Sequence, residues 1–135
     1  MRHSEVINVA LVGNPNTGKS LLFNQLTGLN QKVSNYPGVT VEKKTGTVKL
    51  NNETKASITD LPGTYSINPS SLDENIVLQT FLSIDKKSYP DVVVVVADVE
   101  NLKRNLFLFS QMIAFSLNDG TNPCFEAILH VFPVL

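Results

Sequence analysis

Two kinds of apolar pattern alternate along the chain. Unbroken apolar runs rich in β-branched residues cover residues 6–13 and 91–99, and such runs are typical of strands that are covered on both faces of a sheet. A segment with helical spacing follows each run, at residues 19–28 and 100–115. Strands that alternate with helices in this way predict an α/β fold with a largely parallel sheet.

Shorter patterns predict the remaining elements. Residues 39–50 alternate loosely and are rich in valine and threonine, which predicts a strand that reverses near Gly46. Residues 55–60 predict a short strand, and residues 71–83 predict a helix with Ser71 as its N-cap. The rest of this region holds turn formers without a period and is expected to be loop, at residues 30–40 and 61–71.

Composition narrows the class of protein. The 135 residues are 42% apolar and 17% charged, as in a soluble globular protein of one domain. The formal net charge of −1 gives no field that favours nucleic acid, so we expect no nucleic-acid partner. Cys124 is the only cysteine, which excludes an internal disulfide and a cysteine metal cluster. No signal peptide and no apolar run long enough to cross a bilayer is visible, so this chain is expected to be soluble.

Residues 13–20 read GNPNTGKS and match the phosphate-binding pattern G-x-x-x-x-G-K-[ST]. The pattern stands between an expected strand and an expected helix. Gly13 and Gly18 let the backbone wrap a phosphate chain with its N–H groups turned inward, and the helix N-terminus favours the same anion. Lys19 would contact the β- and γ-phosphates, and the hydroxyl of Ser20 would bind Mg²⁺.

A second motif, DLPG at residues 60–63, follows an expected strand. In phosphate-loop enzymes an aspartate at this place holds Mg²⁺ and the glycine amide contacts the γ-phosphate, which predicts these roles for Asp60 and Gly63. Thr40 lies in the loop between the two motifs. Its hydroxyl is a candidate Mg²⁺ ligand and its N–H a candidate γ-phosphate donor, so that the loop would be ordered by a triphosphate.

The residue after the second motif is Thr64, where many small GTPases carry a glutamine that orients the attacking water. A threonine side chain is too short for that contact, so the water is expected to be held by backbone groups around Val39 and Thr40. Arg104 stands on an expected helix far from this loop along the chain, and no arginine is expected to enter the site.

Five segments together resemble one family. GNPNTGKS, QKVSNYPGVTVEKKTG, DLPGTYS, SLDE and NLKRNL resemble the N-terminal GTPase domain of the ferrous iron transport protein B family, over about Val6 to Met112. The resemblance implies the three-layer phosphate-loop NTPase fold with a mostly parallel sheet. It also implies a GTP-binding domain at the cytoplasmic face of the bacterial inner membrane, whose partner is a membrane permease domain absent from this chain.

The resemblance further implies a potassium ion. In the potassium-activated members the second asparagine of the phosphate loop binds K⁺, and this asparagine matches Asn16. The alternative for Asn14-Pro15-Asn16 is a simple turn. The candidate catalytic residues are then Asn16, Lys19, Thr40 and Gly63, and the candidate metal ligands are Ser20, Thr40, Asp60 and Asn16. Candidate residues for GTP or GDP are Gly13, Asn14, Pro15, Asn16, Thr17, Gly18, Lys19, Ser20, Gly38, Val39, Thr40, Asp60, Leu61, Pro62 and Gly63.

The C-terminal part of the sequence departs from the family. A guanine-reading N-x-x-D, expected near residue 120, is absent from the chain. We therefore divide the chain into a GTP-binding domain at 1–113 and a divergent or truncated tail at 114–135. The tail is a truncated or frame-altered end, a divergent last strand, or a natural short variant. We favour the first, which predicts an incomplete sheet with the strand at 91–99 exposed along one edge.

Three functions follow from this reading. The leading one is a GTPase module that binds GTP with Mg²⁺ and K⁺, hydrolyses it slowly and moves the loops of Thr40 and Gly63. The second is a nucleotide-binding switch or interaction fragment without turnover, which the missing guanine motif supports. The third is a soluble K⁺-dependent GTPase of the ribosome-assembly or tRNA-modification type. The oligomeric state, including a homo-oligomer, stays open.

Overall fold

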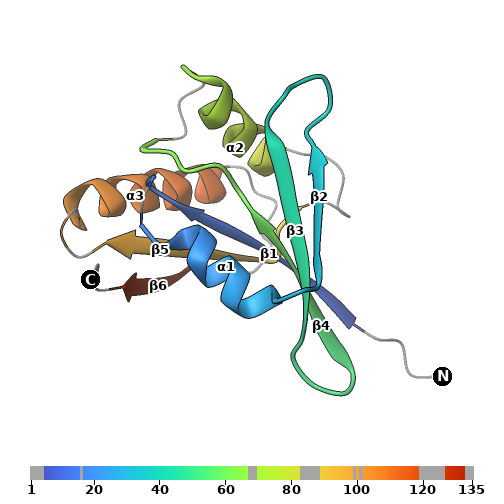
Figure 1. Cartoon of the computed structure of the whole chain (residues 1–135). Coiled ribbons are helices and arrows are strands. Elements are labelled where there is room, and N and C mark those ends of the chain that lie inside the picture. Colours follow the sequence, from blue (N-terminus) through green and yellow to red (C-terminus); the bar gives the residue numbers. More distant parts are fainter. Residues whose placement is uncertain are drawn as a thin grey trace.

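The computed structural model describes residues 5–15, 17–66, 70–82, 89–98, 100, 102–118 and 127–132. In these residues the chain forms one sheet with helices on both faces (Figure 1). The elements are β1 (Glu5–Gly13), α1 (Lys19–Thr27), β2 (Gln31–Asn35), β3 (Glu42–Lys49), β4 (Thr54–Asp60), α2 (Leu72–Leu82), β5 (Val92–Asp98), α3 (Leu102–Asn118) and β6 (Ala127–Phe132).

The strand order is β2-β3-β4-β1-β5-β6. β1 pairs in parallel with β4 and with β5, and β6 pairs in parallel with β5. β2 and β3 form an antiparallel hairpin that extends the sheet beyond β4. The predicted α/β architecture with a mostly parallel sheet is confirmed. β1 lies between its two parallel neighbours, so the loop that leaves its carboxyl end stands at the point where α/β proteins commonly bind ligands.

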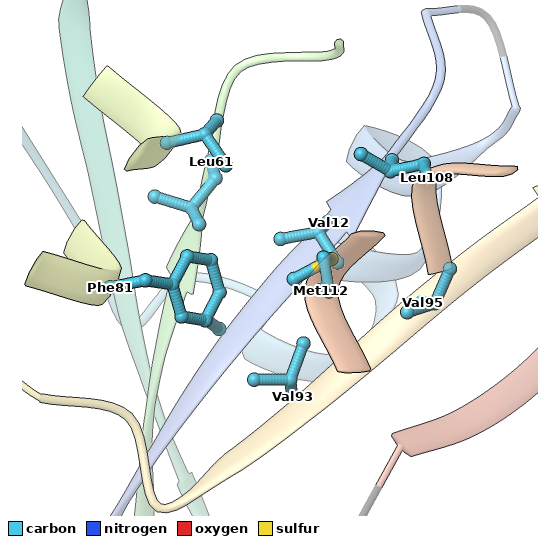
Figure 2. Close-up of a cluster of buried hydrophobic side chains, with 9 residues drawn as sticks. Val12, Leu61, Phe81, Val93, Val95, Leu108 and Met112 are labelled. Carbon is cyan, nitrogen blue, oxygen red and sulfur yellow. The ribbon is translucent and has the colours of Figure 1, made fainter. Parts of the chain in front are cut away.

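Each face of the sheet carries its own apolar core. On one face, Val12, Val93 and Val95 of the strands pack with Phe81 of α2 and with Leu108 and Met112 of α3 (Figure 2). On the other face, Phe23 of α1 is fully buried against Leu11, Ala56 and Ile58. This helix–sheet–helix arrangement explains the unbroken valines of β5, because both faces of that strand are covered.

β3 runs without a break through Gly46, so the predicted reversal at this glycine is wrong. A Cβ atom on Gly46 would lie 2.2 Å from Cγ2 of Thr27 at the end of α1. The glycine therefore marks the close approach of a helix to a strand and not a turn. The need for glycine here depends on Thr27, which lies on another element, so the sequence around Gly46 alone does not reveal it.

The expected loop at 30–40 is wrong in its first half, where Gln31–Asn35 forms β2. These residues pair with β3 from Gln31↔Gly46 to Asn35↔Glu42. No side chain of β2 is buried, because the strand forms the outer edge of the sheet. A strand with no buried face shows no alternation of apolar and polar residues, which is why the pattern favoured a loop.

α1 ends at Thr27, and the N–H of Gly28 donates to the carbonyl of Asn24 at 2.9 Å, as expected for the predicted stop. Its buried residues are Lys19, Phe23 and Thr27, four positions apart. Of the leucines at the predicted helical spacing, Leu21 is 61% exposed and Leu26 is exposed, whereas Leu22 packs against the core around Phe23. The sheet is thus contacted through a narrow row centred on Phe23.

The predicted N-cap of α2 is confirmed. The backbone N–H of Glu74 donates to the hydroxyl of Ser71 at 3.2 Å. The carboxylate of Glu74 accepts from the hydroxyl of Ser70 at 2.7 Å. Two serines therefore hold the first turn of the helix that follows the second motif.

β6 corrects the expectation for the C-terminal part. It pairs with β5 from Val93↔Ala127 to Asp98↔Phe132, so β5 is not an exposed edge. α3 also continues past residue 114 to Asn118. The physical reason is that residues 127–132 supply the strand pairing that β5 needs. Cys124 lies outside the described residues.

Candidate functional site

The loop of residues 13–20 connects the end of β1 to the start of α1. Gly13 lies against β5, where an added Cβ would stand 2.6 Å from the carbonyl oxygen of Val96. Gly18 is the N-cap of α1 and has a φ of 85°, a left-handed conformation that favours glycine. The two motif glycines are thus required for different reasons. Gly13 allows a close approach of two backbones, and Gly18 allows the turn into the helix.

Asn14 and Thr17 are buried inside this loop. The hydroxyl of Thr17 donates to the carbonyl of Asn14 at 3.0 Å. The side-chain nitrogen of Asn14 donates to the carbonyl of Thr64 at 2.8 Å, with the amide assigned in the orientation that satisfies both of its ends. Asn14 therefore braces the phosphate loop from within, a role that the sequence did not reveal.

The DLPG loop lies directly against the phosphate loop. The N–H of Leu61 donates to the carbonyl of Leu11 at 3.1 Å, and the N–H of Thr64 donates to the carbonyl of Gly13 at 2.9 Å. A Cβ on Gly63 would meet Cα of Pro15 at 2.9 Å. Both predicted motifs, including Pro62 between these contacts, are thus brought together at the carboxyl ends of β1 and β4.

Three functional side chains meet at this point. The ammonium of Lys19 forms an ion pair with Oδ1 of Asp60, and both residues are buried. The hydroxyl of Ser20 donates to Oδ2 of the same carboxylate at 3.2 Å. A hydroxyl and a carboxylate at this separation are the oxygen donors that Mg²⁺ prefers, so these residues fit the metal that the motifs imply.

Gly38, Val39 and Thr40 lie in the connection between β2 and β3, which Figure 1 shows beside α2. The N–H of Val39 donates to the carbonyl of Tyr36 at 3.2 Å, and Gly38 between them has a φ of 75°, which is a Pro-Gly turn of type II. Thr40 is exposed, and none of the hydrogen bonds found among the described residues joins it to the phosphate loop. Asn16 lies outside the described residues.

Tyr36 stands at the start of this turn and has an unusual hydroxyl. Burial, and secondarily the negative charge of Asp60, raise the pKa of Tyr36 to about 12. Its hydroxyl oxygen is buried, and no described residue forms a hydrogen bond with it. The ammonium of Lys43 lies 5.8 Å from the centre of the ring.

Arg104 is nearer to the site than its place in the sequence indicated. Its guanidinium lies 5.4 Å from the centre of the Tyr65 ring, directly after the DLPGT segment. The expectation of a distant arginine is wrong, because the start of α3 follows the carboxyl end of β5 and returns to the same edge of the sheet. The contact is a cation–π interaction at an exposed tyrosine.

Sequence reasoning missed two buried polar residues beside the site. Asp98 ends β5, and its carboxylate accepts from the N–H of Glu100 at 3.0 Å. Asn105 is fully buried, and its side-chain nitrogen donates to the carbonyl of Asp98 at 3.5 Å. The available signal was the position of Asn105 in the buried row of α3, three and seven residues before Leu108 and Met112.

The strand that follows α3 lies further along the chain than the sequence predicted. The strand that follows α3 is β6, which ends at Phe132, whereas the motif was expected near residue 120. Residues 119–126 and 133–135 lie outside the described part, and for β6 only the backbone, including that of His130, is described.

Two surveys of the described residues complete the description of the site. Within the described residues, no helix has both the length and the hydropathy for crossing a bilayer. The same residues hold no group of three or more His, Cys, Asp or Glu side chains that could bind a metal ion.

Comparison with known proteins identifies the family. The profile of the family described as "Ferrous iron transport protein B" matches residues 7–119. The Fe(2+) transporter FeoB of Leptospira biflexa is 51% identical over 106 residues, and that of Methanocaldococcus jannaschii is 48% identical over 105 residues. Each alignment covers 78% of this chain and 15% of the relative, so the chain spans a small part of these transporters.

Solved structures agree with the sequence matches. The G domain of the Thermotoga maritima FeoB iron transporter superposes with a TM-score of 0.80 at 39% identity, covering 94% of this chain and 72% of that domain. A variant of Streptococcus thermophilus NFeoB bound to GDP gives a TM-score of 0.75 at 40% identity, covering 93% of this chain and 44% of that protein. With the phosphate-loop geometry, these matches show that the chain belongs to the ferrous iron transport protein B family and has the fold of its G domain.

Proposed function

We propose that this chain is the GTP-binding and GTP-hydrolysing module of a ferrous iron transporter. The observation that carries the proposal is the meeting of Lys19, Ser20 and Asp60 at the N-terminus of α1, beside the left-handed Gly18. This arrangement unites a cation, two metal-binding oxygens and the N–H groups of a helix start. GDP-bound NFeoB from S. thermophilus, with the same fold, supports the guanine nucleotide as ligand.

The residues of this chain divide the work by their chemistry. The N–H groups of residues 13–20 would hold the phosphates, and Lys19 would offset their charge. Ser20 and Asp60 would hold Mg²⁺, which when bound neutralises charge on the β- and γ-phosphates. Thr40 and Gly63 would contact the γ-phosphate, which requires the exposed Thr40 loop to move toward the site.

Potassium assistance belongs to the same proposal. Asn16 matches the asparagine that binds K⁺ in potassium-activated members of the family, and an amide oxygen is a neutral ligand suited to a monovalent cation. An ion there would offset the charge that develops between the β- and γ-phosphates. Thr64 supports the need for such help, because it is buried, is bonded to the phosphate loop through its backbone, and has a shorter side chain than the glutamine that orients the attacking water in many small GTPases.

The partner and location follow from the relatives. The transporters matched here are far longer than this chain. A structure with the same fold is described as the cytosolic domain of T. maritima FeoB. We therefore propose a membrane permease domain as the partner, on the cytoplasmic face of the membrane, with movement of the Thr40 and Gly63 loops as the signal.

Calorimetry with the nucleotides themselves tests this proposal. GDP and GTP titrated with Mg²⁺ should bind the folded chain, and Lys19→Ala should abolish the heat signal. Lys55→Ala, an exposed lysine on β4, is the matched control and should bind as the parent does. Absence of binding to the folded parent would refute the function.

A nucleotide-binding switch without turnover is the second candidate. The absence of N-x-x-D from the sequence favours it, because a site that reads the base poorly loses selectivity and positioning. Competition of ATP against GTP measures the selectivity, and phosphate release in KCl against NaCl measures the turnover. Binding without phosphate release in either salt would identify this second candidate.

A further inference from the structure

A cavity of about 610 Å³ lies between α2 and the face of the sheet that this helix covers. No residue of 13–20 or 60–63 lines it, but Val39, a candidate nucleotide-binding residue of the neighbouring loop, does. Its lining includes Asn8, Val9 and Ala10 in the middle of β1, before Gly13 begins the phosphate loop. A cavity of this size is typical of sites for small organic molecules.

Several polar side chains line the cavity, although more of its surface is apolar than polar. Thr45 of β3 and Thr59 of β4 lie opposite each other in the strand pairing, and both line the cavity together with Ser57. From the other side, Asn75 and Gln79 of α2 contribute amides one turn apart. A few placed polar groups in a largely apolar pocket favour an occupant that carries a polar group on an apolar body.

Charge and hydrogen bonding indicate the sign of that occupant. Lys43 is the only ionised side chain among the residues that line the cavity, and no carboxylate of the described residues pairs with it. Tyr36 lines the cavity beside Lys43, and its buried hydroxyl forms no hydrogen bond with any described residue. An ammonium and a free O–H donor on one wall together favour an acceptor with negative charge.

Most of the remaining lining residues are apolar, and the hydroxyl of the polar one, Thr80, donates to the carbonyl of Ile76. Val39 and Ile76 face the cavity from the Tyr36 turn and from α2. These side chains favour an apolar body, which a small inorganic anion lacks. From this combination we infer that the cavity binds a small organic monoanion, a carboxylate carried on an apolar ring, with the carboxylate at Lys43 and Tyr36.

The place of the cavity gives such a ligand a regulatory role. One wall is the turn directly before Thr40, and the other is the helix that follows the DLPG loop. A ligand that contacts both would fix their relative position and change how easily the Thr40 loop moves. Binding itself does not depend on the proposed nucleotide function, so the two are tested separately.

Fluorine NMR of the whole chain provides the test, with 4-(trifluoromethyl)benzoate as probe and the neutral 4-(trifluoromethyl)benzamide as its matched control. We expect saturable binding of the benzoate and binding at least about tenfold weaker for the benzamide, as a charge-assisted contact requires. Lys43→Met should lower the affinity for the benzoate by a similar factor. Lys55→Met, the same change on β4 outside the cavity, should leave it unchanged.

A second variant tests the place of binding. Gln79→Trp changes an exposed position of α2 that lines the cavity, so the fold is retained while the space is filled. Its loss of benzoate binding, with an unchanged thermal transition, supports the site. No saturable binding to the parent, equal binding of both probes, or benzoate binding that survives both Lys43→Met and Gln79→Trp would each overturn the inference.

Discussion

Lys19 and Asp60 form a buried ion pair that joins the first turn of α1 to the carboxyl end of β4. The two residues are 41 positions apart in the sequence, and in the proposed function one is the cation for the phosphates and the other the carboxylate for the metal. The hydroxyl of Ser20 bonds to the same carboxylate. The groups that the ligands need are therefore ordered by one another, which is a form of preorganisation.

Asp60→Asn should destabilise the chain and alter its use of Mg²⁺. Removing one charge of a buried pair leaves the other without compensation, which costs about 3 kcal/mol in the free energy of unfolding, measured by urea denaturation. In EDTA the freed Lys19 should bind GDP at least as tightly as in the parent, while the gain in affinity on adding Mg²⁺ should disappear. Asp73→Asn, on the exposed first turn of α2, is the matched control. A full Mg²⁺ effect in Asp60→Asn would contradict the role of this carboxylate.

Gly63→Ala should weaken nucleotide binding without unfolding the chain. The added Cβ would stand 2.9 Å from Cα of Pro15 and force the two loops apart. Misaligning one charge-assisted hydrogen bond costs about 1.5–3 kcal/mol, so GTP affinity measured by calorimetry should fall about tenfold or more. An unchanged affinity would show that these loops can separate without affecting the ligand.

Gly46→Ala should reduce stability through packing alone. The new Cβ would meet the side chain of Thr27 at 2.2 Å, and overpacking of this kind typically costs about 1–3 kcal/mol in urea denaturation. Adding Thr27→Ala should recover part of the loss, because it removes the atom in closest contact. Thr47→Ala, at an exposed position of the same strand, serves as the control for lost strand preference. Strictly additive losses in the double variant would exclude this contact as the cause.

Because the pKa of Tyr36 is raised to about 12, the free energy of unfolding should depend on pH in the alkaline range. The folded state keeps the phenolic proton in a pH range where the unfolded chain releases it at its ordinary pKa of 10.0, so the folded state binds more protons there. The contribution is complete below pH 10 and is lost as the pH rises toward 12. Tyr36→Phe should flatten this pH dependence, and absorbance of tyrosinate should show the parent's extra group titrating near 12. Identical profiles for both proteins would refute the shift.

The motifs could be predicted because their geometry is local. The phosphate loop, its helix and the N-cap of α2 depend on residues within a few positions of one another, and all are found where expected. The meeting of Asp60 with Ser20 follows from parallel strands, whose carboxyl ends share one edge of the sheet.

The features that sequence reasoning missed depend on contacts between distant elements. Gly46 is required by Thr27, and Arg104 reaches Tyr65 only because α3 begins at the edge where β4 ends. β2 leaves no apolar signature, since none of its side chains is buried. Such relationships are fixed by the assembled sheet and cannot be read from a window of neighbouring residues.

The unburied β2 has a mechanical consequence for the loop that it carries. A strand with one face in a core keeps its register, because a shift would bring the wrong residues inside, whereas β2 has no such penalty. Sliding β2 by two residues along β3 would keep each side chain on its face and change the length of the connection around Tyr36, at the cost of the hydrogen bonds that the Gln31 amide donates to Asn24 and Thr27. A change in the register of this outermost strand would therefore lengthen or shorten the loop that contains Thr40, while the buried central strands keep their register.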